Sequence, residues 1–512
     1  MQRSHLIKLL GIDLRSLAFF RVAIALVVLN DVFARIPDLT VFYSDAGVLP
    51  RAEVFSMHSP YDLSVYFMAG SAVSMAILFL LHALSAVGLL AGFRTRLMVF
   101  LCWLFTISIQ DRNPLVMMGG ADAYLRLLLF WGMFLPLGQR FSLDAALNPR
   151  KEQDPPLLFN LATSAILLQC VIVYLMTSAQ KWSMGIWRDG TAVSYVLNNE
   201  IFAKSAAQYF LQFPALLTGL TYVVPAFEFF GPVLLFCPWG TGLLRTLTVL
   251  GFIFMHTAFF VCIDVEFFQF VSIAALLLFL PAWFWDTLVP QARSLFVKTG
   301  GGVPDGLLKE NPLPARGPAV LSALISWLKR FERPRSEVKV VPAWLTSLII
   351  LLFFTCVVSW NAERIMPSRY RMPKISKTIC SWAHLGQGWR MFVDPLQRGW
   401  FVVAGTLRNG AEVELLNDGS PLTWEKPELI SKHFKNERWR KFLFRLLGNR
   451  RAALDYGIYL CRSWNSSHAA DKKLESLQIV LISKPTPEKE TTPFRKHLIL
   501  EQDCRSLPPG KQ

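Results

Sequence analysis

The sequence predicts an all-α polytopic membrane bundle of about nine transmembrane helices, followed by a small α+β extracytoplasmic domain. Two observations carry this prediction. Apolar residues make up 53% of the 512 residues, charged residues only 17%, and the mean hydropathy is +0.39, whereas soluble domains carry about 25% charged residues. After Trp360 the composition becomes that of a soluble domain. Together these features exclude a disordered chain, a fibrous repeat and an ordinary soluble enzyme.

The nine predicted spans follow from the length that a helix needs to cross a bilayer, about 20 apolar residues. The candidate segments are 16–36, 71–92, 97–112, 122–138, 157–178, 214–237, 242–263, 265–288 and 342–360. The third and fourth segments are short and are joined by a polar stretch at 110–114. A re-entrant pair is therefore the alternative for these two. The predicted layout is a membrane domain at 1–288, a basic linker at 289–341, a ninth helix at 342–360 and an outer domain at 361–512.

The direction of the spans is predicted from the positions of Lys and Arg. The chain has 52 basic and 36 acidic residues, a net charge of +16. Basic residues occur at the N-terminus and in the loops 94–96, 140–151, 240–245 and 289–341, which alternate with spans so that all fall on one side. Because cytoplasmic loops are the basic ones, we expect the N-terminus in the cytoplasm and the C-terminal domain outside a bacterial-type inner (plasma) membrane. In so apolar a chain the basic charge indicates membrane lipids as partners, and no nucleic acid.

Two alternatives concern the segments next to the membrane domain. The first span would be a cleaved signal peptide if it had a short apolar core and a cleavage site, but Arg21, Asn30 and Asp31 interrupt its apolar run. The linker is rich in Gly and Pro and is expected to be a flexible solvated loop. One amphipathic helix near 317–331 is the alternative.

The outer domain contains a predicted β-hairpin. The strand-like run 400–407 is followed by Asn409 and Gly410 and then by the run 411–416. Asn-Gly between such runs is the strongest short hairpin signal, and it predicts a type I′ turn with positive φ at both central residues. Further strands are expected at 476–483 and 496–501, with helices across 427–462 between them.

Cysteine positions allow at most one disulfide in the outer domain. Five of the eight cysteines lie in or beside the predicted spans, where they are expected to be buried apolar residues. Cys380, Cys461 and Cys504 lie outside the spans. Cys461–Cys504 is the predicted pair. The chain contains no spacing typical of a metal site, and we expect no metal.

Ionisable residues within spans are candidate site residues, because their burial costs several kcal/mol unless they are paired or hydrated. Glu228 lies near the middle of the sixth predicted span, and His256 slightly outside the middle of the seventh. These spans are sequential and antiparallel, so the two side chains are expected at neighbouring depths. One interpretation is a proton-handling or ligand-binding pair. The other is a structural hydrogen-bonded pair that locks two helices.

A second polar group is expected at the outer ends of the spans, where Asn113, Asp122, Arg126 and Lys181 gather. A lysine at this position beside a tryptophan is usually a snorkelling anchor. A lysine drawn into an apolar cavity becomes a base instead. We expect a pocket lined by Lys181, His256, Asp122 and Arg126 with Asn113 nearby, in which Asp122 or Asp31 offsets the positive charge.

The same residues carry a resemblance to the HTTM (horizontally transferred transmembrane domain) family, which is related to the membrane part of vitamin K-dependent gamma-carboxylase. The run NPLVMMGGADAYLRLLLFW at 113–131 resembles the central signature of that family. So do the run at 42–50, the stretch WRDGT at 187–191 that follows Lys181, and His256. The resemblance covers roughly residues 11–290.

The resemblance implies a chemistry for the pocket. In the carboxylase a membrane lysine deprotonates a reduced vitamin K quinol, and Lys181 is the position that matches this base. By this resemblance Lys181 and His256 would be catalytic. Asn113, Asp122, Arg126 and Glu228 would bind a reduced menaquinone or a vitamin K-like quinol. The alternative class is a non-enzymatic transporter, lipid-binding or scaffold protein that presents its outer domain. The orientation of Lys181, toward an enclosed pocket or toward lipid heads, distinguishes the two classes.

Overall fold

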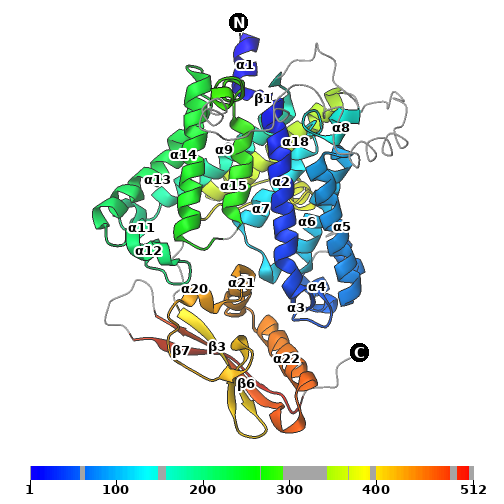
Figure 1. The fold of residues 1–512 in the computed structure, drawn as a ribbon, viewed down its shortest axis with the longest axis vertical. Coiled ribbons are helices and arrows are strands. Elements are labelled where there is room, and N and C mark those ends of the chain that lie inside the picture. The colour runs from blue at the N-terminus through cyan, green and yellow to red at the C-terminus, as the bar shows by residue number, and fades with distance from the viewer. Residues whose placement is uncertain are drawn as a thin grey trace, which may run out of the picture.

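Figure 1 shows a helical bundle with a small sheet-containing layer at one end, opposite the N-terminus. The structure is a computed structural model that describes residues 2–57, 64–147, 157–265, 267–291, 343–366, 368–392, 399–484 and 493–506. The chain is mostly helical. Nearly all of the predicted linker at 289–341 lies outside the described residues, and so does the helix near 317–331 that was the alternative to a flexible loop.

Within the described ranges, six helical segments are long and apolar enough to cross a membrane. They are Leu14–Tyr43 (α2 Leu14–Arg35, the turn η1 Ile36–Asp38 and α3 Leu39–Tyr43), α5 Ala72–Ala91, α9 Leu161–Trp182, α13 Pro214–Leu235, α14 Thr241–Cys262 and Trp344–Ile365 of α18 (Ala343–Ile365). A seventh is formed if the pair Phe268–Phe279 and Phe284–Gln291, bent by 91°, counts as one span. This count is compatible with a multi-pass membrane protein.

The third and fourth predicted spans correspond to α6 (Thr95–Arg112) and α7 (Gly120–Gly132), joined through η3 (Pro114–Val116). Asp144 accepts hydrogen bonds from the backbone N–H groups of Arg94 and Thr95, both at 2.8 Å, and so caps the start of α6. The 13 residues of α7 extend only about 20 Å, less than the roughly 30 Å of a bilayer core. Nine full spans therefore stay a prediction.

Short elements connect the long helices. On the N-terminal side these are α1 Gln2–Leu10, β1 Ile12–Asp13, α4 Arg51–Met57, η2 Val65–Met68, α8 Leu143–Leu147 and β2 Leu157–Leu158, with β1 and β2 antiparallel. Further along lie α10 Gly185–Arg188, α11 Ala192–Leu197, α12 Ser205–Phe210, α15 Phe268–Leu276, η4 Leu277–Phe279, η5 Phe284–Leu288 and α19 Lys374–Trp382.

The layer at the end of the bundle opposite the N-terminus is here called the outer layer, and its sheet the outer sheet. This sheet has five antiparallel strands in the order β5-β4-β3-β6-β7. Their bounds are β3 Gly399–Leu407, β4 Glu412–Glu414, β5 Ser420–Pro421, β6 Leu474–Ser483 and β7 Arg495–Asp503. The predicted strands at 400–407, 476–483 and 496–501 are confirmed. The helices expected across 427–462 are α20 Ile430–His433, α21 Glu437–Leu446 and α22 Arg450–Ser467, with η6 Leu415–Asn417 and η7 Ala470–Lys472 as short turns.

The predicted hairpin is confirmed, but the predicted turn type is wrong. β3 pairs with β4 in the register Ala404↔Glu414 and Thr406↔Glu412. Gly410 has φ +81, whereas Asn409 is absent from the residues with positive φ, so the turn is not type I′. The N–H of Gly410 donates to the carbonyl of Leu407 at 2.9 Å. This bond closes an ordinary turn in which only the glycine needs a left-handed conformation.

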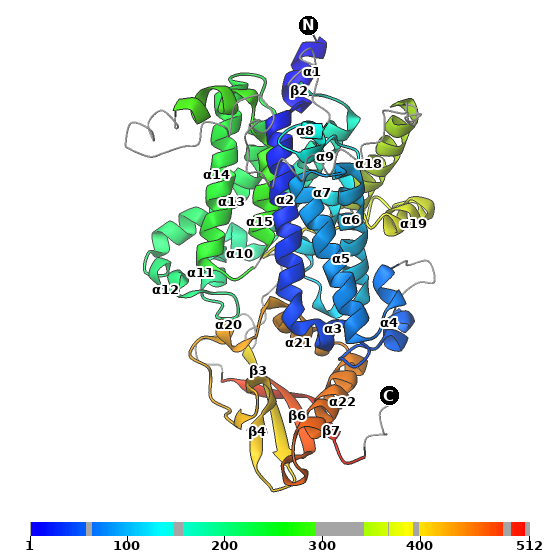
Figure 2. The same cartoon turned by 45° about the vertical axis from the view of Figure 1, so that its right-hand side comes forward.

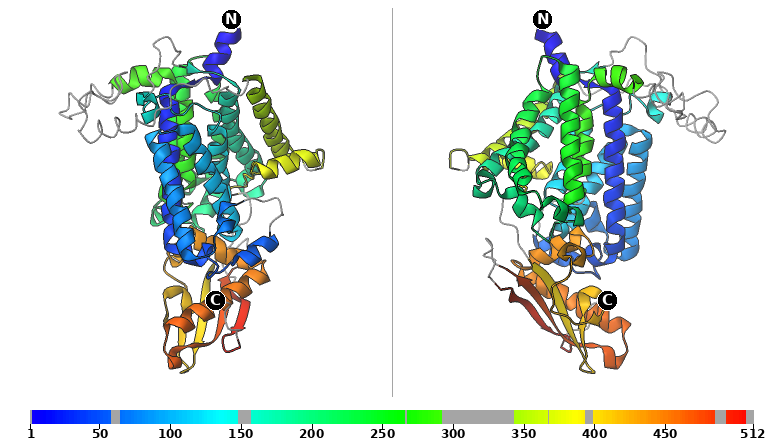
Figure 3. Two further views of the ribbon diagram at one scale, coloured as in Figure 1. Left: turned by 90° about the vertical axis from the view of Figure 1, so that its right-hand side faces the viewer. Right: turned by 60° about the vertical axis from the view of Figure 1, so that its left-hand side comes forward.

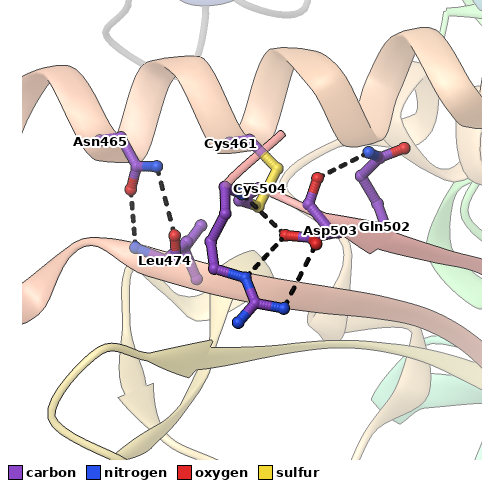
Figure 4. The surroundings of a disulfide bond; sticks show 7 residues. Cys461, Asn465, Leu474, Gln502, Asp503 and Cys504 are labelled. Atoms are coloured by element: carbon purple, nitrogen blue, oxygen red, sulfur yellow. Dashed lines mark hydrogen bonds and ion pairs between the residues drawn. A yellow bond between two sulfur atoms is a disulfide. The ribbon is translucent and has the colours of Figure 1, made fainter. Parts of the chain in front are cut away.

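The predicted disulfide Cys461–Cys504 is confirmed and joins α22 to the end of β7 (Figure 4). One helical turn further on, the side-chain amide of Asn465 binds both backbone groups of Leu474 at the start of β6, with N–H···O distances of 2.6 and 3.3 Å (Figure 4). These covalent and polar contacts fix α22 across the outer pair of strands.

Helix α21 lies between the sheet and the bundle, near the lower ends of α2 and α3 (Figure 2). The views in Figure 3 show the same stacking of the two layers. The α21 N-cap Asn436 and Trp439 both donate to the carboxylate of Asp38, at 2.7 and 2.8 Å. A continuous cluster of buried apolar residues extends from Leu17 in the bundle to Phe401 in the sheet. The two layers therefore share one core.

Candidate functional site

A cavity of about 440 Å³ lies where the outer layer meets the bundle. Its lining comes from α9, α13 and α14, from the loop before α7, from the segment 388–392 and from α21. Half of its side chains are apolar, among them Phe202, Phe259, Phe268 and Phe392. Its ionisable lining residues include Lys181, Glu228 and His256. The structure thus brings three of the predicted site residues to one apolar cavity.

Lys181 and Glu228 form a buried ion pair in this cavity. The Nζ atom of Lys181 donates to both carboxylate oxygens of Glu228, at 2.7 and 2.8 Å. The two residues are 2% and 3% exposed, so Lys181 does not extend into lipid heads. Lys181 lies in the last turn of α9, and Glu228 lies in the middle of α13. Each charge offsets the cost of burying the other.

The ammonium group of Lys181 has a second neighbour, because its Nζ atom lies 4.8 Å from the ring centre of Trp187. An aromatic face attracts a cation through the ring quadrupole. A second polar contact joins the same two helices, because Ser178 of α9 donates a 2.8 Å hydrogen bond to the carbonyl of Pro225, about one turn before Glu228 on α13. The α9–α13 contact is thus polar at two successive turns of α13.

His256 is held at the cavity by Tyr174. The Nε2 atom of His256 lies 2.9 Å from the hydroxyl of Tyr174. The Nδ1 atom is buried and has no hydrogen-bond partner among the described residues. Phe259 and Phe268 flank the imidazole with ring centres at 6.1 and 5.9 Å. A buried nitrogen without a partner in a native structure calls for an explanation, and a ligand oxygen in the cavity supplies one.

The other predicted pocket residues lie elsewhere, because Asn113, Asp122 and Arg126 are absent from the described lining of the cavity. Asn113 is a structural residue that donates to the carbonyl of Phe42 at 2.9 Å. Asp122 accepts from the N–H of Met118 at 2.6 Å. Arg126 donates to the carbonyl of His384 at 2.9 Å. Asp122 and Arg126, predicted in the lining, and Asn113, predicted nearby, thus each bind other groups.

Asp31 and Asp122, predicted to offset positive charge near the pocket, contact arginines and not Lys181. Asp31 binds Arg35 at 3.0 Å and also contacts Arg438, and Asp122 lies 3.4 Å from Arg35. Glu228 fulfils that role instead. The prediction that Glu228 and His256 lie at neighbouring depths agrees with their shared cavity, although each binds a different partner.

Sequence reasoning missed the residues that cover the cavity. Arg364 at the end of α18, Arg390 in the segment 388–392, and Glu437 and Lys441 of α21 all belong to the lining. No local spacing relates these positions to Lys181. Tyr174 was also missed, although it precedes Lys181 by two helical turns and so faces the same side of α9. That periodicity is a signal that the sequence does carry.

Comparison of the chain with protein-family models, with curated proteins and with solved structures finds no match. Within the described part of the chain, no group of three or more His, Cys, Asp or Glu side chains is placed to hold a metal ion. The candidate site is therefore defined by its geometry alone: an apolar cavity with one buried ion pair and one buried imidazole.

Proposed function

We propose that this chain is a multi-pass plasma-membrane protein of the HTTM family, and an enzyme that removes a proton from an apolar ligand. The observation that carries the proposal is the Lys181–Glu228 pair, which faces the same cavity as Nδ1 of His256, a buried atom without a hydrogen-bond partner among the described residues. Titratable groups that share an apolar cavity are the usual composition of a catalytic site. The family assignment is supported by the sequence resemblance at 113–131.

The pair would act as one proton acceptor. Transfer of a proton from Nζ of Lys181 to Oε1 of Glu228, across 2.7 Å, leaves a neutral amine and a neutral acid. A low-dielectric cavity favours this neutral form more than water does. The amine then accepts a proton from a ligand hydroxyl. The products are the ammonium form of Lys181 and a deprotonated ligand. Glu228 is thus part of the base in this scheme.

The lining fits a reduced quinol such as menaquinol. Aromatic rings of Phe259, Phe268 and Phe392 suit a flat ring, and the buried Nδ1 of His256 suits a ring oxygen. When bound, a quinol supplies an ionisable hydroxyl and two electrons. Lys181 would accept the hydroxyl proton, and His256, oriented by Tyr174, would position the oxygen.

A non-enzymatic role as a transporter, lipid-binding or scaffold protein is the second candidate. It is favoured by the bidentate geometry of the Lys181–Glu228 pair, which by itself ties α9 to α13. In that case the pair only stabilises the bundle. The enzymatic function requires Lys181 to remove a proton from a bound ligand, whereas the non-enzymatic function does not. The decisive measurement is therefore ligand turnover.

The test begins with mass spectrometry of the lipids and quinones that copurify with the protein. Menaquinol oxidation, with dissolved oxygen supplied as the electron acceptor, is then measured in lipid nanodiscs for the wild type and for Lys181→Ala and His256→Ala. We expect a loss of at least about 100-fold for Lys181→Ala, the usual contribution of a positioned base. Lys432→Ala, on an exposed lysine of the outer layer, is the control. Unchanged turnover in both cavity variants would support the scaffold role.

The orientation is part of the proposal. The N-terminus and the outer sheet lie at opposite ends of the bundle (Figure 1), which agrees with a cytoplasmic N-terminus and an extracytoplasmic sheet. Reporter fusions at Arg335 and after the last residue should report opposite sides. The same report from both would contradict the arrangement.

A further inference from the structure

The amino-terminal end of α7 forms part of the cavity wall. The lining includes four consecutive residues at this point, Met118, Gly119, Gly120 and Ala121. Because a glycine has no side chain, the wall at Gly119 and Gly120 is the backbone itself. Gly119 has φ +68, a conformation that residues with side chains rarely adopt, and a Cβ atom added there would meet no atom within 4 Å. Open space therefore lies against the backbone where α7 begins.

The first turn of α7 presents N–H groups at this end. An α-helix leaves its first N–H groups without intrahelical partners, and they point out of its amino-terminal end. In many helices a side chain at the N-cap accepts from them, but the N-cap here is Gly119, which makes no such bond. Within the described part of the chain, neither the N–H of Gly120 nor that of Ala121 donates a hydrogen bond. These donors carry the positive end of the helix dipole.

The carboxylates near this helix end already have cationic partners. Asp122, in the first turn of α7, lies 3.4 Å from Arg35 and 3.7 Å from Arg438. Both carboxylates of the described lining, Glu228 and Glu437, are also paired with cations. The amino-terminal end of α7 can therefore attract a further anion.

A second polar group of the cavity lies close to this helix end. A Cβ atom added at Gly120 would lie 3.9 Å from Cε2 of Phe268, and the ring centre of Phe268 is 5.9 Å from that of His256. Gly120 and His256 are therefore neighbours of one aromatic ring. His256 is 2% exposed, and its Nδ1 atom has no hydrogen-bond partner among the described residues. Buried polar groups without protein partners at one cavity indicate a polar ligand.

We propose that the N–H groups of Gly120 and Ala121 bind the oxygen anion of a deprotonated aromatic hydroxyl, in the manner of an oxyanion hole. Helix amino termini and pairs of backbone N–H groups are common sites for such anions. The inference rests on the proposed function for the origin of the anion, because Lys181 is the group that takes the proton. Binding of the anion lowers the free energy of the deprotonated ligand and so favours the transfer.

The test compares the affinities of the full-length protein in detergent for two ring compounds of nearly the same shape. The compound 2-hydroxy-1,4-naphthoquinone is an anion at neutral pH, whereas 2-methoxy-1,4-naphthoquinone carries no charge. Isothermal titration calorimetry with each gives the anion preference, which is the ratio of the two affinities, without any turnover. We expect the wild type to prefer the anion by at least about tenfold. Equal affinities would overturn the proposal.

The variant Gly120→Pro removes one N–H donor at the first helical position, where proline is compatible with an α-helix. It should lower the anion preference at least about threefold, because one of two donors is lost. Gly120→Ala is the conservative variant. It adds a Cβ atom in ordinary contact with Met391 and Phe268, at 3.6 and 3.9 Å, but keeps the N–H. A fall as large in Gly120→Ala as in Gly120→Pro would refute the assignment, as would an unchanged preference in folded Gly120→Pro.

If Gly120→Pro does not fold, the other donor is removed instead. Lactic acid incorporated in place of Ala121 replaces this N–H by an ester oxygen and keeps the methyl group. The anion preference should again fall at least about threefold. An unchanged preference in this protein would overturn the proposal.

The charge of Lys181 is a second source of anion preference, and Lys181→Met/Glu228→Leu removes it together with its partner. We expect this double variant to retain most of the anion preference while it loses menaquinol oxidation. Loss of both would assign the anion to Lys181 and overturn the role of α7. If both were retained, the anion site would stand, and the proposed role of Lys181 as the base would be refuted.

Discussion

Arg438 of α21 contacts the carboxylate of Asp31, 407 residues earlier in the chain, in the first candidate membrane span. Both residues are buried, at 3% and 2% exposure. Arg438 also donates to the carbonyl of Val116 at 2.9 Å and lies 3.7 Å from Asp122. A single arginine thus connects the outer layer to α2 and to the loop before α7. The attachment of the outer layer therefore depends on charges inside the bundle.

Arg438→Met should destabilise the protein by about 3 kcal/mol or more, because it leaves buried acceptors with one donor fewer. Denaturation in mild detergent, followed by tryptophan fluorescence, measures the change. Arg451→Met is the matched control: Arg451 binds Glu53 across the same two layers but its side chain is 64% exposed, so its loss should cost at most about 1 kcal/mol. Equal losses of stability in the two variants would contradict the prediction that the buried arginine contributes more than the exposed one.

Lys181→Met should destabilise the protein by about 3–5 kcal/mol, since it leaves the Glu228 carboxylate buried without its cation. Lys181→Met/Glu228→Leu should recover most of that loss, because an apolar pair needs no desolvated charge. Comparing the single and double variants in the same denaturation experiment measures this coupling. A double variant as unstable as the sum of both single variants would show that the residues act independently.

The disulfide between Cys461 and Cys504 closes a loop with a sequence separation of 43 residues. Reduction should lower the stability of the outer layer by about 4 kcal/mol on the chain-entropy estimate. Thermal unfolding with and without dithiothreitol measures this effect. Cys461→Ser/Cys504→Ser should be insensitive to the reductant, whereas Cys237→Ser, at a free cysteine, should respond like the wild type. The same response in both variants would exclude this disulfide as the cause.

The carboxyl of Asp455 in α22 should make the outer layer less stable as the pH rises. Burial and the neighbouring charge of Glu53 raise its pKa from 3.8 to about 6, against the opposing effect of Arg451 and Arg462. A raised carboxyl pKa means that the folded state binds the proton more tightly. The resulting stabilisation is complete below pH 3.8 and is lost as the pH rises through about 6.

Asp455→Asn should therefore be more stable than the wild type at pH 7.5, and the difference should disappear near pH 4. Unfolding midpoints across this range test the expectation. Asp471→Asn, at an exposed position, serves as the control for removal of a negative charge. A constant difference between Asp455→Asn and the wild type at all pH values would contradict the shifted pKa.

Gly410→Val should cost roughly 1–2 kcal/mol, because its φ of +81 forces a β-branched residue into a left-handed conformation. Gly448→Val is the matched control. An added Cβ meets no atom within 4 Å at either glycine, but only Gly410 has a positive φ. Chemical denaturation compares the two, and equal effects would show that the turn conformation does not matter.

The parts of the fold that the sequence could predict depend on local signals. Long apolar runs located helices such as α5 and α9, and alternation with an Asn-Gly turn located β3 and β4. The turn type was missed because Asn-Gly adopts positive φ at both residues only when these two residues alone form the hairpin loop. Here the carbonyl of Leu407 is instead bound by Gly410.

The sequence predicts which residues belong to the candidate site better than it predicts which of them pair with one another. The cost of burying charge singled out Lys181, Glu228 and His256, because that cost depends only on depth in a span. Which partner offsets a buried charge depends on helix packing, and no sequence spacing relates Lys181 to a glutamate 47 residues later. Asp122 and Arg126 belong to the same polar belt but turn toward Arg35 and His384.

The contacts of α21 also bear on how the chain is made. Asp31 and Asp38 leave the ribosome some 400 residues before Arg438 and Trp439, which bind them. During synthesis the first span must therefore hold carboxylates whose partners do not yet exist, apart from Arg35. A product truncated before residue 436 would leave the carboxylate of Asp38 without Asn436 and Trp439, and that of Asp31 without Arg438.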